Sequence, residues 1–182
     1  MKRRLLFLGP PGAGKGTQAE RISKSYSLLH LSTGDLLRNE VEKDSVLGKQ
    51  AKDIMDKGEL VSDELVLSIV EQKIILQNQG WLLDGFPRNL IQAKALQSLL
   101  EKINQPIEQV VLLEVNDEIL IHRLLARGRS DDNEQTIRHR LKVYREKTTP
   151  LINHYSNLGL LKGVNGDGEM KEIEKKIEEI LL

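Results

Sequence analysis

The sequence predicts a three-layer α/β fold in which a five-stranded parallel sheet has helices on both faces. Short apolar runs alternate along the chain with longer segments of helical periodicity, an order typical of parallel sheets built from strand–helix–strand units. The runs are almost continuously apolar, as is expected for strands that are buried on both faces. Strands are expected at residues 5–8, 28–31, 81–83, 110–115 and 160–164.

The segments between these strands carry signals for the ends of helices. One helix begins near Lys15, and the cap at residues 32–35 opens helical stretches that run to about Gly58. Pro150 is expected to kink or interrupt a long helix over 132–155, because proline lacks the N–H that a helix interior needs. The other expected helices cover residues 62–80, 90–103, a stretch that begins at 116–117, and 169–182.

Length and composition narrow the class of protein. The chain has 182 residues, close to the size of one domain, and its lack of cysteine excludes disulfides, zinc–thiolate sites and thiol nucleophiles. Lys and Arg together number 27, as do Asp and Glu, so the formal net charge is zero. This balance argues against nucleic acid or an anionic membrane as the main partner. Because no apolar run approaches the roughly 18 residues of a membrane helix, we expect a soluble, cytoplasmic protein.

A glycine-rich segment follows the first expected strand. Residues 9–16 read Gly-Pro-Pro-Gly-Ala-Gly-Lys-Gly, with Thr17 next. Between a strand and a helix, such a segment can turn its backbone N–H groups toward a phosphate, because glycine adopts positive φ and brings no Cβ. The helix N-terminus and the Lys15 ammonium add positive charge. The alternative is a flexible turn with a solvated lysine. Because Gly16 separates Lys15 from the hydroxyl of Thr17, direct magnesium ligation by Thr17 is not expected.

This loop and three further segments resemble the signatures of nucleoside monophosphate kinases, and of adenylate kinases in particular. The further segments are Leu-Ser-Thr-Gly-Asp-Leu-Leu-Arg at 31–38, Asp-Gly-Phe-Pro-Arg at 84–88 and Arg-Gly-Arg-Ser-Asp-Asp at 127–132. The resemblance covers nearly the whole chain. It implies a P-loop NTPase fold and reversible phosphoryl transfer from MgATP to AMP, which gives two ADP and serves adenine nucleotide homeostasis. It also implies a monomer, with Mg²⁺ as the cofactor carried by ATP.

The resemblance also sorts the residues of the site into sets. Catalytic roles fall to Lys15, Asp84, Arg88, Arg127, Arg129 and Arg140. ATP binding falls to Gly12, Ala13, Gly14, Lys15, Gly16, Thr17, Arg123, Arg127 and Gly168. AMP binding falls to Thr33, Arg38, Met55, Glu59, Leu60, Val61, Gly85, Phe86, Pro87, Arg88, Gln92, Arg129 and Arg140. No direct metal ligand is implied: Asp84 suits a contact with Mg²⁺ through water, although an ordinary Asp turn is the alternative.

Six of the arginines lie between residues 123 and 145. On composition alone, they form a solvated helix face interleaved with acidic residues, and a nucleic-acid patch is disfavoured because Tyr144 is the only aromatic residue there. By resemblance, several of them neutralise the phosphates during transfer, and Arg123 stacks near the donor adenine. Asp131 and Asp132 would orient these arginines, although capping of the next helix explains Asp132 equally well. No catalytic base is needed, because the attacking phosphate oxygen of AMP is already ionised.

The resemblance divides the single kinase domain into a core and two covers. The core comprises residues 1–31, 62–126 and 134–182, the AMP-binding segment residues 32–61 and the lid residues 127–133. The long form of the family inserts an extra lid subdomain, sometimes with zinc held by cysteines. This chain has no cysteine and a lid of a few residues, so we expect the short-lid form without structural zinc.

Three alternative functions stay open at this point. A kinase of the same fold that acts on UMP or CMP shares most of the motifs, but Thr33 and Gln92 favour AMP. The amide of Gln92 offers both the acceptor and the donor that the adenine edge requires. A guanine-specific nucleotide switch needs an Asn-Lys-x-Asp string, which the sequence lacks. A nucleic-acid binder that uses the arginines is disfavoured by the zero net charge.

Overall fold

The computed structural model describes residues 1–75, 77–129 and 131–182. Within them, five strands form one sheet in the order β2-β3-β1-β4-β5, and every neighbouring pair is parallel. The strands are β1 (Arg4–Leu8), β2 (Leu29–Ser32), β3 (Trp81–Asp84), β4 (Gln109–Glu114) and β5 (Leu161–Asn165). The predicted parallel α/β sheet is therefore confirmed, with strand ends that differ from the prediction by at most one residue.

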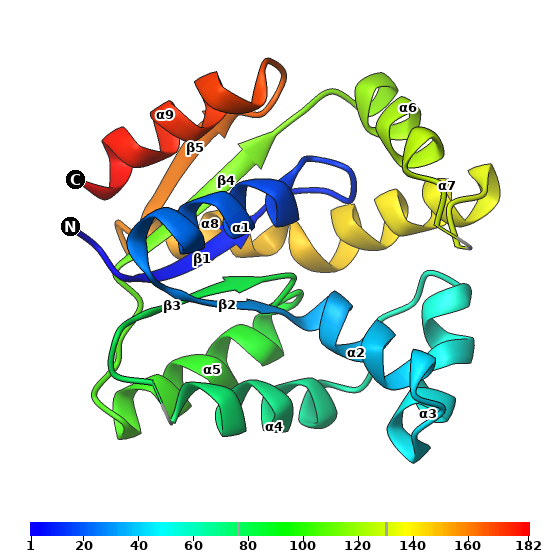
Figure 1. Cartoon of the computed structure of the whole chain (residues 1–182), viewed down its shortest axis with the longest axis horizontal. Coiled ribbons are helices and arrows are strands. Elements are labelled where there is room, and N and C mark those ends of the chain that lie inside the picture. Colours follow the sequence, from blue (N-terminus) through cyan, green and yellow to red (C-terminus); the bar gives the residue numbers. More distant parts are fainter. Residues whose placement is uncertain (76, 130) are drawn as a thin grey trace.

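Helices cover both faces of this sheet. They are α1 (Lys15–Tyr26), α2 (Thr33–Glu42), α3 (Val46–Asp56), α4 (Asp63–Ile74), α5 (Leu90–Lys102), α6 (Asp117–Arg127), α7 (Glu134–Val143), the π-helix η1 (Tyr144–Thr148), α8 (Pro150–Asn157) and α9 (Met170–Leu181). Figure 1 shows α4 and α5 along one side of the molecule and α9 along the opposite side. In the same view, α2 and α3 lie at the end of the molecule where α6 and α7 also lie. None of the helices described is both long and apolar enough to cross a membrane.

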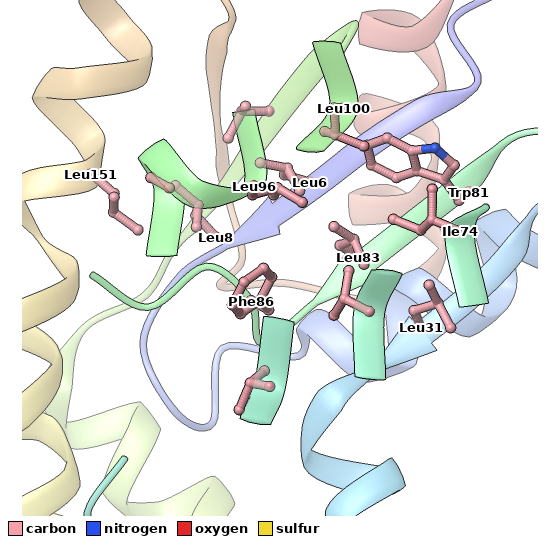
Figure 2. Close-up of a cluster of buried hydrophobic side chains, with 14 of the residues drawn as sticks. Leu6, Leu8, Leu31, Ile74, Trp81, Leu83, Phe86, Leu96, Leu100 and Leu151 are labelled. Carbon is pink, nitrogen blue, oxygen red and sulfur yellow. The ribbon is translucent and has the colours of Figure 1, made fainter. Parts of the chain in front are cut away.

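The alternation of side chains along β1 builds two separate cores. Leu6 and Leu8 join a cluster with the apolar residues of α4, α5 and α8, whereas Leu5 and Phe7 join a cluster with α1, α6, α7 and α9. Successive side chains of a strand point to opposite faces, so a strand with helices on both sides must be apolar throughout. Figure 2 shows the first cluster, in which the indole of Trp81 lies close to the side chain of Leu100.

The expected helix over 132–155 is broken into three pieces. Pro150 begins α8, and the turn before it is a π-helix in which the Thr149 N–H donates to the Tyr144 carbonyl at 2.9 Å. Proline suits the first turn of a helix because it has no N–H to satisfy there, and the π-turn carries the chain into it. The interruption at Pro150 is thus confirmed. The N-cap of α7 is Asn133, whose side chain accepts from the Thr136 N–H at 2.9 Å.

Two other helix boundaries differ from the prediction. The helical stretch up to Gly58 is a pair, α2 and α3, separated by a tight turn in which Asp44 has φ 51°. The predicted end of the next helix at Gly80 is wrong, since α4 ends at Ile74. Gly80 instead turns the chain into β3 with φ 101°, where a Cβ would lie 2.5 Å from the Arg3 carbonyl oxygen. A glycine is required at position 80 because the two backbones approach closely there, and not because a helix ends there.

Gly48 of α3 lies directly against the backbone of α2. A Cβ there would lie 2.0 Å from the Glu40 carbonyl oxygen. We expect Gly48→Ala to lower the free energy of unfolding by about 1–3 kcal/mol through overpacking, although alanine favours a helix by about 1 kcal/mol. Urea unfolding followed by circular dichroism measures this. Gln50→Ala, at an exposed position of the same helix, is the control. A Gly48→Ala variant that is as stable as the wild-type protein contradicts the prediction.

Candidate active site

One large cavity of about 900 Å³ opens beyond the carboxyl ends of β1, β2 and β3. In parallel α/β sheets, this edge is where ligands bind, because the loops that follow the strands converge there. Parallel pairing places Phe7 of β1 and Ser32 of β2 on either side of Asp84 at the end of β3. The cavity is lined by residues from the segments 7–20, 30–38, 55–66, 84–92, 123–148 and 168–173. Parts of the chain that are far apart in sequence therefore share one site.

The glycine-rich loop forms the floor of this cavity. Gly12 and Gly14 have φ values of 85° and 91°, and α1 begins directly afterwards at Lys15. A Cβ at Gly12 would lie 2.9 Å from Leu124 Cγ, so the loop also packs closely on α6. Positive φ at these positions and the N-terminus of α1 give the arrangement that an anion-binding backbone loop requires. The alternative of a flexible turn with a solvated lysine does not describe this structure, since Lys15 is held within the loop.

Lys15 donates from Nζ to the Gly9 carbonyl at 2.8 Å and to the Pro10 carbonyl at 3.0 Å. Burial lowers the pKa of Lys15 from 10.5 to about 8; nearby Asp84 opposes this shift, and the positive charges of Arg88 and Arg127 add to it. An ammonium group in this environment lacks an anionic partner that would compensate it fully. The cavity floor therefore favours the arrival of a negatively charged group.

Asp84 ends β3 with its side chain 7% exposed. Its Oδ2 lies 3.4 Å from the position that a Cβ would take on Gly16, so the carboxylate faces the phosphate loop. Within the described residues, no group of three or more His, Cys, Asp or Glu side chains is arranged to hold a metal ion. A single buried carboxylate beside a phosphate loop suits a cation that brings its own waters and phosphate ligands, as Mg²⁺ does.

Arg88 also lines the cavity and is fixed by the turn that precedes it. Its Nε donates to the Gly85 carbonyl at 2.7 Å, and Thr33 Oγ1 donates to the same carbonyl at 3.0 Å. The Arg88 carbonyl in turn accepts from Thr148 Oγ1 at 2.7 Å. Burial lowers the pKa of the Arg88 guanidinium, nearby Asp84 opposes this shift, and Arg38 adds to it. The guanidinium is thus placed rigidly, with further positive charge around it.

The six arginines between 123 and 145 separate into two groups. Four of them line the cavity, namely Arg123, Arg127, Arg129 and Arg140. Arg138 pairs along its own helix with Glu134 at 2.8 Å and Arg145 pairs with Asp117, and neither lines the cavity. The interpretation as a solvated helix face therefore holds for Arg138 and Arg145 only.

Carboxylates orient three of the arginines that line the cavity. Asp132 accepts from Arg127 Nε at 2.9 Å and Nη2 at 2.7 Å, and Asp131 pairs with Arg140. Arg129 lies 3.6 Å from Asp35. Asn133 caps α7, so Asp132 is not the helix cap. Asp132 instead holds Arg127. Burial lowers the pKa of Arg140 to about 10, and repulsion from the neighbouring arginines adds to this shift.

The structure brings the predicted site residues together with one exception. All residues predicted for ATP and AMP binding line the cavity except Phe86. The Phe86 ring is 1% exposed and belongs to the apolar core (Figure 2). The prediction that Phe86 contacts a ligand is therefore not supported by its position; the ring anchors the turn that presents Gly85 and Arg88. The lid prediction includes residue 130, which lies outside the described residues.

Two carboxylates that hold predicted site residues, and one buried amide in the cavity, were not predicted from the sequence. Asp35 was expected only as part of a helix cap, yet it lines the cavity and pairs with both Arg38 and Arg129. Asp63 was expected only to start a helix, yet it accepts a hydrogen bond from Gln92. Gln18 is 2% exposed, lines the cavity and donates from Nε2 to the Met170 carbonyl at 2.9 Å. A carboxylate three residues before an arginine was the available signal for Asp35; for Asp63 no local signal exists.

Comparisons with known proteins agree with this geometry. The family model described as "Adenylate kinase" matches residues 7–160. The adenylate kinase of Prochlorococcus marinus strain MIT 9313 is 65% identical over 181 residues and that of strain MIT 9303 is 64% identical, in both cases over 100% of each chain. The adenylate kinase of Synechococcus sp. strain RCC307 is 60% identical over 97% of each chain. The phosphate loop, the converging arginines and these matches together show that the chain belongs to the adenylate kinase family.

Proposed function

We propose that this protein catalyses the reversible transfer of the γ-phosphoryl group of MgATP to AMP, giving two ADP, and so maintains the balance of adenine nucleotides. The observation that carries the proposal is the convergence of Lys15, Arg88 and five further arginines on one cavity. Phosphoryl transfer spreads negative charge over the transferred group and both flanking phosphates, so fixed cations on all sides stabilise its transition state. Membership of the adenylate kinase family supports the same reaction.

The donor nucleotide occupies the side of the cavity formed by the phosphate loop. Backbone N–H groups of residues 12–17 bind the polyphosphate at the N-terminus of α1. Lys15 exchanges its carbonyl partners in the loop for phosphate oxygens, which compensate its charge better. The donor adenine lies beside Arg123 and Gly168, which both line the cavity. Arg123 is tied to the segment that precedes Gly168, because its Nη1 donates to the Gly166 carbonyl at 3.0 Å.

The acceptor AMP occupies the opposite side, between the segment 32–61 and the turn at 84–88. Arg38 and Arg88 bind its phosphate, because a guanidinium can donate two parallel hydrogen bonds to a phosphate dianion. Gln92 reads the adenine edge. The remaining residues line the ribose and base and comprise Thr33, Met55, Glu59, Leu60, Val61, Gly85 and Pro87.

Transfer requires position and charge rather than proton removal. The attacking oxygen belongs to the AMP phosphate, which is ionised at neutral pH, so no side chain has to act as a base. Arg127, Arg129 and Arg140 neutralise the transferred group from the lid side. Asp84 would hold Mg²⁺ through water, and the chemistry that the ion would supply there is neutralisation of charge on the donor phosphates.

Two parts of the chain close over the substrates and exclude water, which would otherwise accept the phosphoryl group. These are the AMP-binding segment 32–61 and the lid 127–133. Polar contacts between the two covers and α7 support this role: Arg129 lies 3.6 Å from Asp35, His139 Nε2 lies 2.7 Å from Glu59 Oε1, and Arg140 donates to the Met55 carbonyl at 3.3 Å. Such contacts can be exchanged for contacts with phosphate. The proposal also includes that the protein acts as a monomer in the cytoplasm.

A coupled assay with MgATP and each monophosphate in turn tests the proposal. We expect kcat/KM to be highest with AMP and about a hundredfold lower with UMP and CMP, because their bases cannot satisfy the Gln92 amide in the same way. A preference for a pyrimidine nucleotide contradicts the assignment of AMP as acceptor. Absence of transfer to every monophosphate contradicts the enzymatic proposal itself.

Lys15→Met and Arg88→Ala test the charge-based mechanism. Each variant loses one buried cation beside the transferred phosphoryl group, so kcat/KM should fall by about a hundredfold to a thousandfold. Far-ultraviolet circular dichroism and thermal unfolding should show that both remain folded. Arg138→Ala is the matched control, because this arginine of α7 is exposed and pairs only along its own helix. Near-normal kcat/KM in either test variant removes the mechanism.

The pKa of Lys15, lowered to about 8 by burial, predicts a pH dependence of ATP binding. In the free protein the ammonium loses its proton as the pH rises through about 8, whereas bound phosphates favour the protonated form. ATP affinity should therefore fall above pH 8, by up to about tenfold per pH unit, with proton uptake on binding. Titration calorimetry between pH 7 and pH 9.5 measures both quantities. Lys15→Arg keeps its charge over this range, so an equal fall in that variant excludes Lys15 as the cause.

A further inference from the structure

The side-chain amide of Gln92 is held by the protein at both of its ends. Gln92 is 3% exposed and lines the cavity. Its Oε1 accepts from the Arg88 backbone N–H at 2.6 Å, and its Nε2 donates to Asp63 Oδ1 at 2.7 Å. A backbone N–H can only donate and an ionised carboxylate can only accept, so these two partners specify which way round the amide lies.

Asp63 stands at the start of α4 and connects it to the start of α5. The same Oδ1 that accepts from Gln92 also accepts from Asn89 Nδ2 at 2.9 Å. Asn89 is the N-cap of α5, and its own Oδ1 accepts from the Gln92 backbone N–H at 2.8 Å. Asp63 is half-buried, and this network ties it to Gln92 across 29 residues of sequence. Its position is thus fixed by two helix starts rather than by a mobile loop.

The contacts made inside the protein leave half of the amide unused. A primary amide has two N–H groups and two lone pairs, and the described contacts of Gln92 take one of each. One N–H and one lone pair remain for a ligand in the cavity. The adenine edge presents an amine donor at N6 and an acceptor at N1, which match this pair. Hypoxanthine and guanine present the opposite pattern, an acceptor at O6 and a donor at N1, and match only an amide that has turned over.

We infer that Asp63 is a positioning residue that sets the purine specificity of the acceptor site: by accepting from Gln92 Nε2, it keeps the amide in the orientation that reads adenine. This rests on the proposed function, in which Gln92 contacts the acceptor base. Without Asp63, only the Arg88 N–H opposes rotation of the amide, and rotation would leave that N–H facing another donor. Loss of Asp63 therefore weakens the discrimination without abolishing it.

Steady-state assays with AMP and IMP as acceptors test the inference in a matched series. Asp63→Ala removes the acceptor, Asp63→Asn keeps an acceptor oxygen but removes the charge, and Glu64→Ala removes the other, exposed carboxylate of the same helix turn. We expect the ratio of kcat/KM for AMP to that for IMP to fall about tenfold in Asp63→Ala alone. In that variant KM for AMP should rise, while KM for ATP stays unchanged.

The possible outcomes separate positioning from a structural role. General destabilisation would lower kcat/KM for both acceptors together and leave their ratio unchanged. The inference is overturned by a wild-type ratio in Asp63→Ala, or by an equal loss in Asp63→Asn or Glu64→Ala. If Asp63→Ala does not fold, Asp63→Ser takes its place, because its shorter hydroxyl suits a helix start but does not reach Gln92. A wild-type protein that shows no preference for AMP over IMP contradicts the proposed role of Gln92 itself.

Discussion

The accumulation of positive charge in a largely buried cavity is the constraint on which this structure depends. Lys15, Arg88 and Arg140 are all buried far enough for their pKa values to fall, and each lies near other cations. Such groups are costly to hold without anions. Asp84 and Asp131 compensate part of the charge, and the phosphates of two nucleotides would compensate the rest. The same cluster of buried cations therefore supplies both the binding energy for the nucleotides and the stabilisation of the transition state.

The parallel sheet makes this accumulation possible. Because all five strands run in one direction, the loops that follow β1, β2 and β3 end at one edge, and their helices begin there. Helix N-termini add partial positive charge at the same edge. The two apolar clusters pack against the faces of the sheet, whereas Glu59 and the Met55 carbonyl make polar contacts with His139 and Arg140 of α7. Polar contacts of this kind can exchange with phosphate, and apolar packing cannot.

Features that depend on neighbouring residues were predictable, and features that depend on distant packing were not. The phosphate loop and the interruption at Pro150 follow from local backbone chemistry, namely positive φ for glycine and the missing N–H of proline. Gly80 was wrongly predicted to end a helix. A glycine is required there because the backbone of Arg3, just before β1, approaches it closely. By residue type, the N-cap of α7 could have been Asp132 or Asn133. In the structure Asn133 caps the helix, and Asp132 accepts from Arg127.

The amino-acid sequence alone determined the class of fold, the phosphate loop and the family resemblance, since these rest on periodicity and on contiguous motifs. Tertiary structure alone decided which arginines face the cavity, that Phe86 belongs to the core, and that Asp63 holds Gln92. The physical reason is that a side chain's direction and partners depend on how elements pack across long separations in sequence. Four arginines meet at one site because their helices and loops surround it, and no local pattern distinguishes them from Arg138 and Arg145.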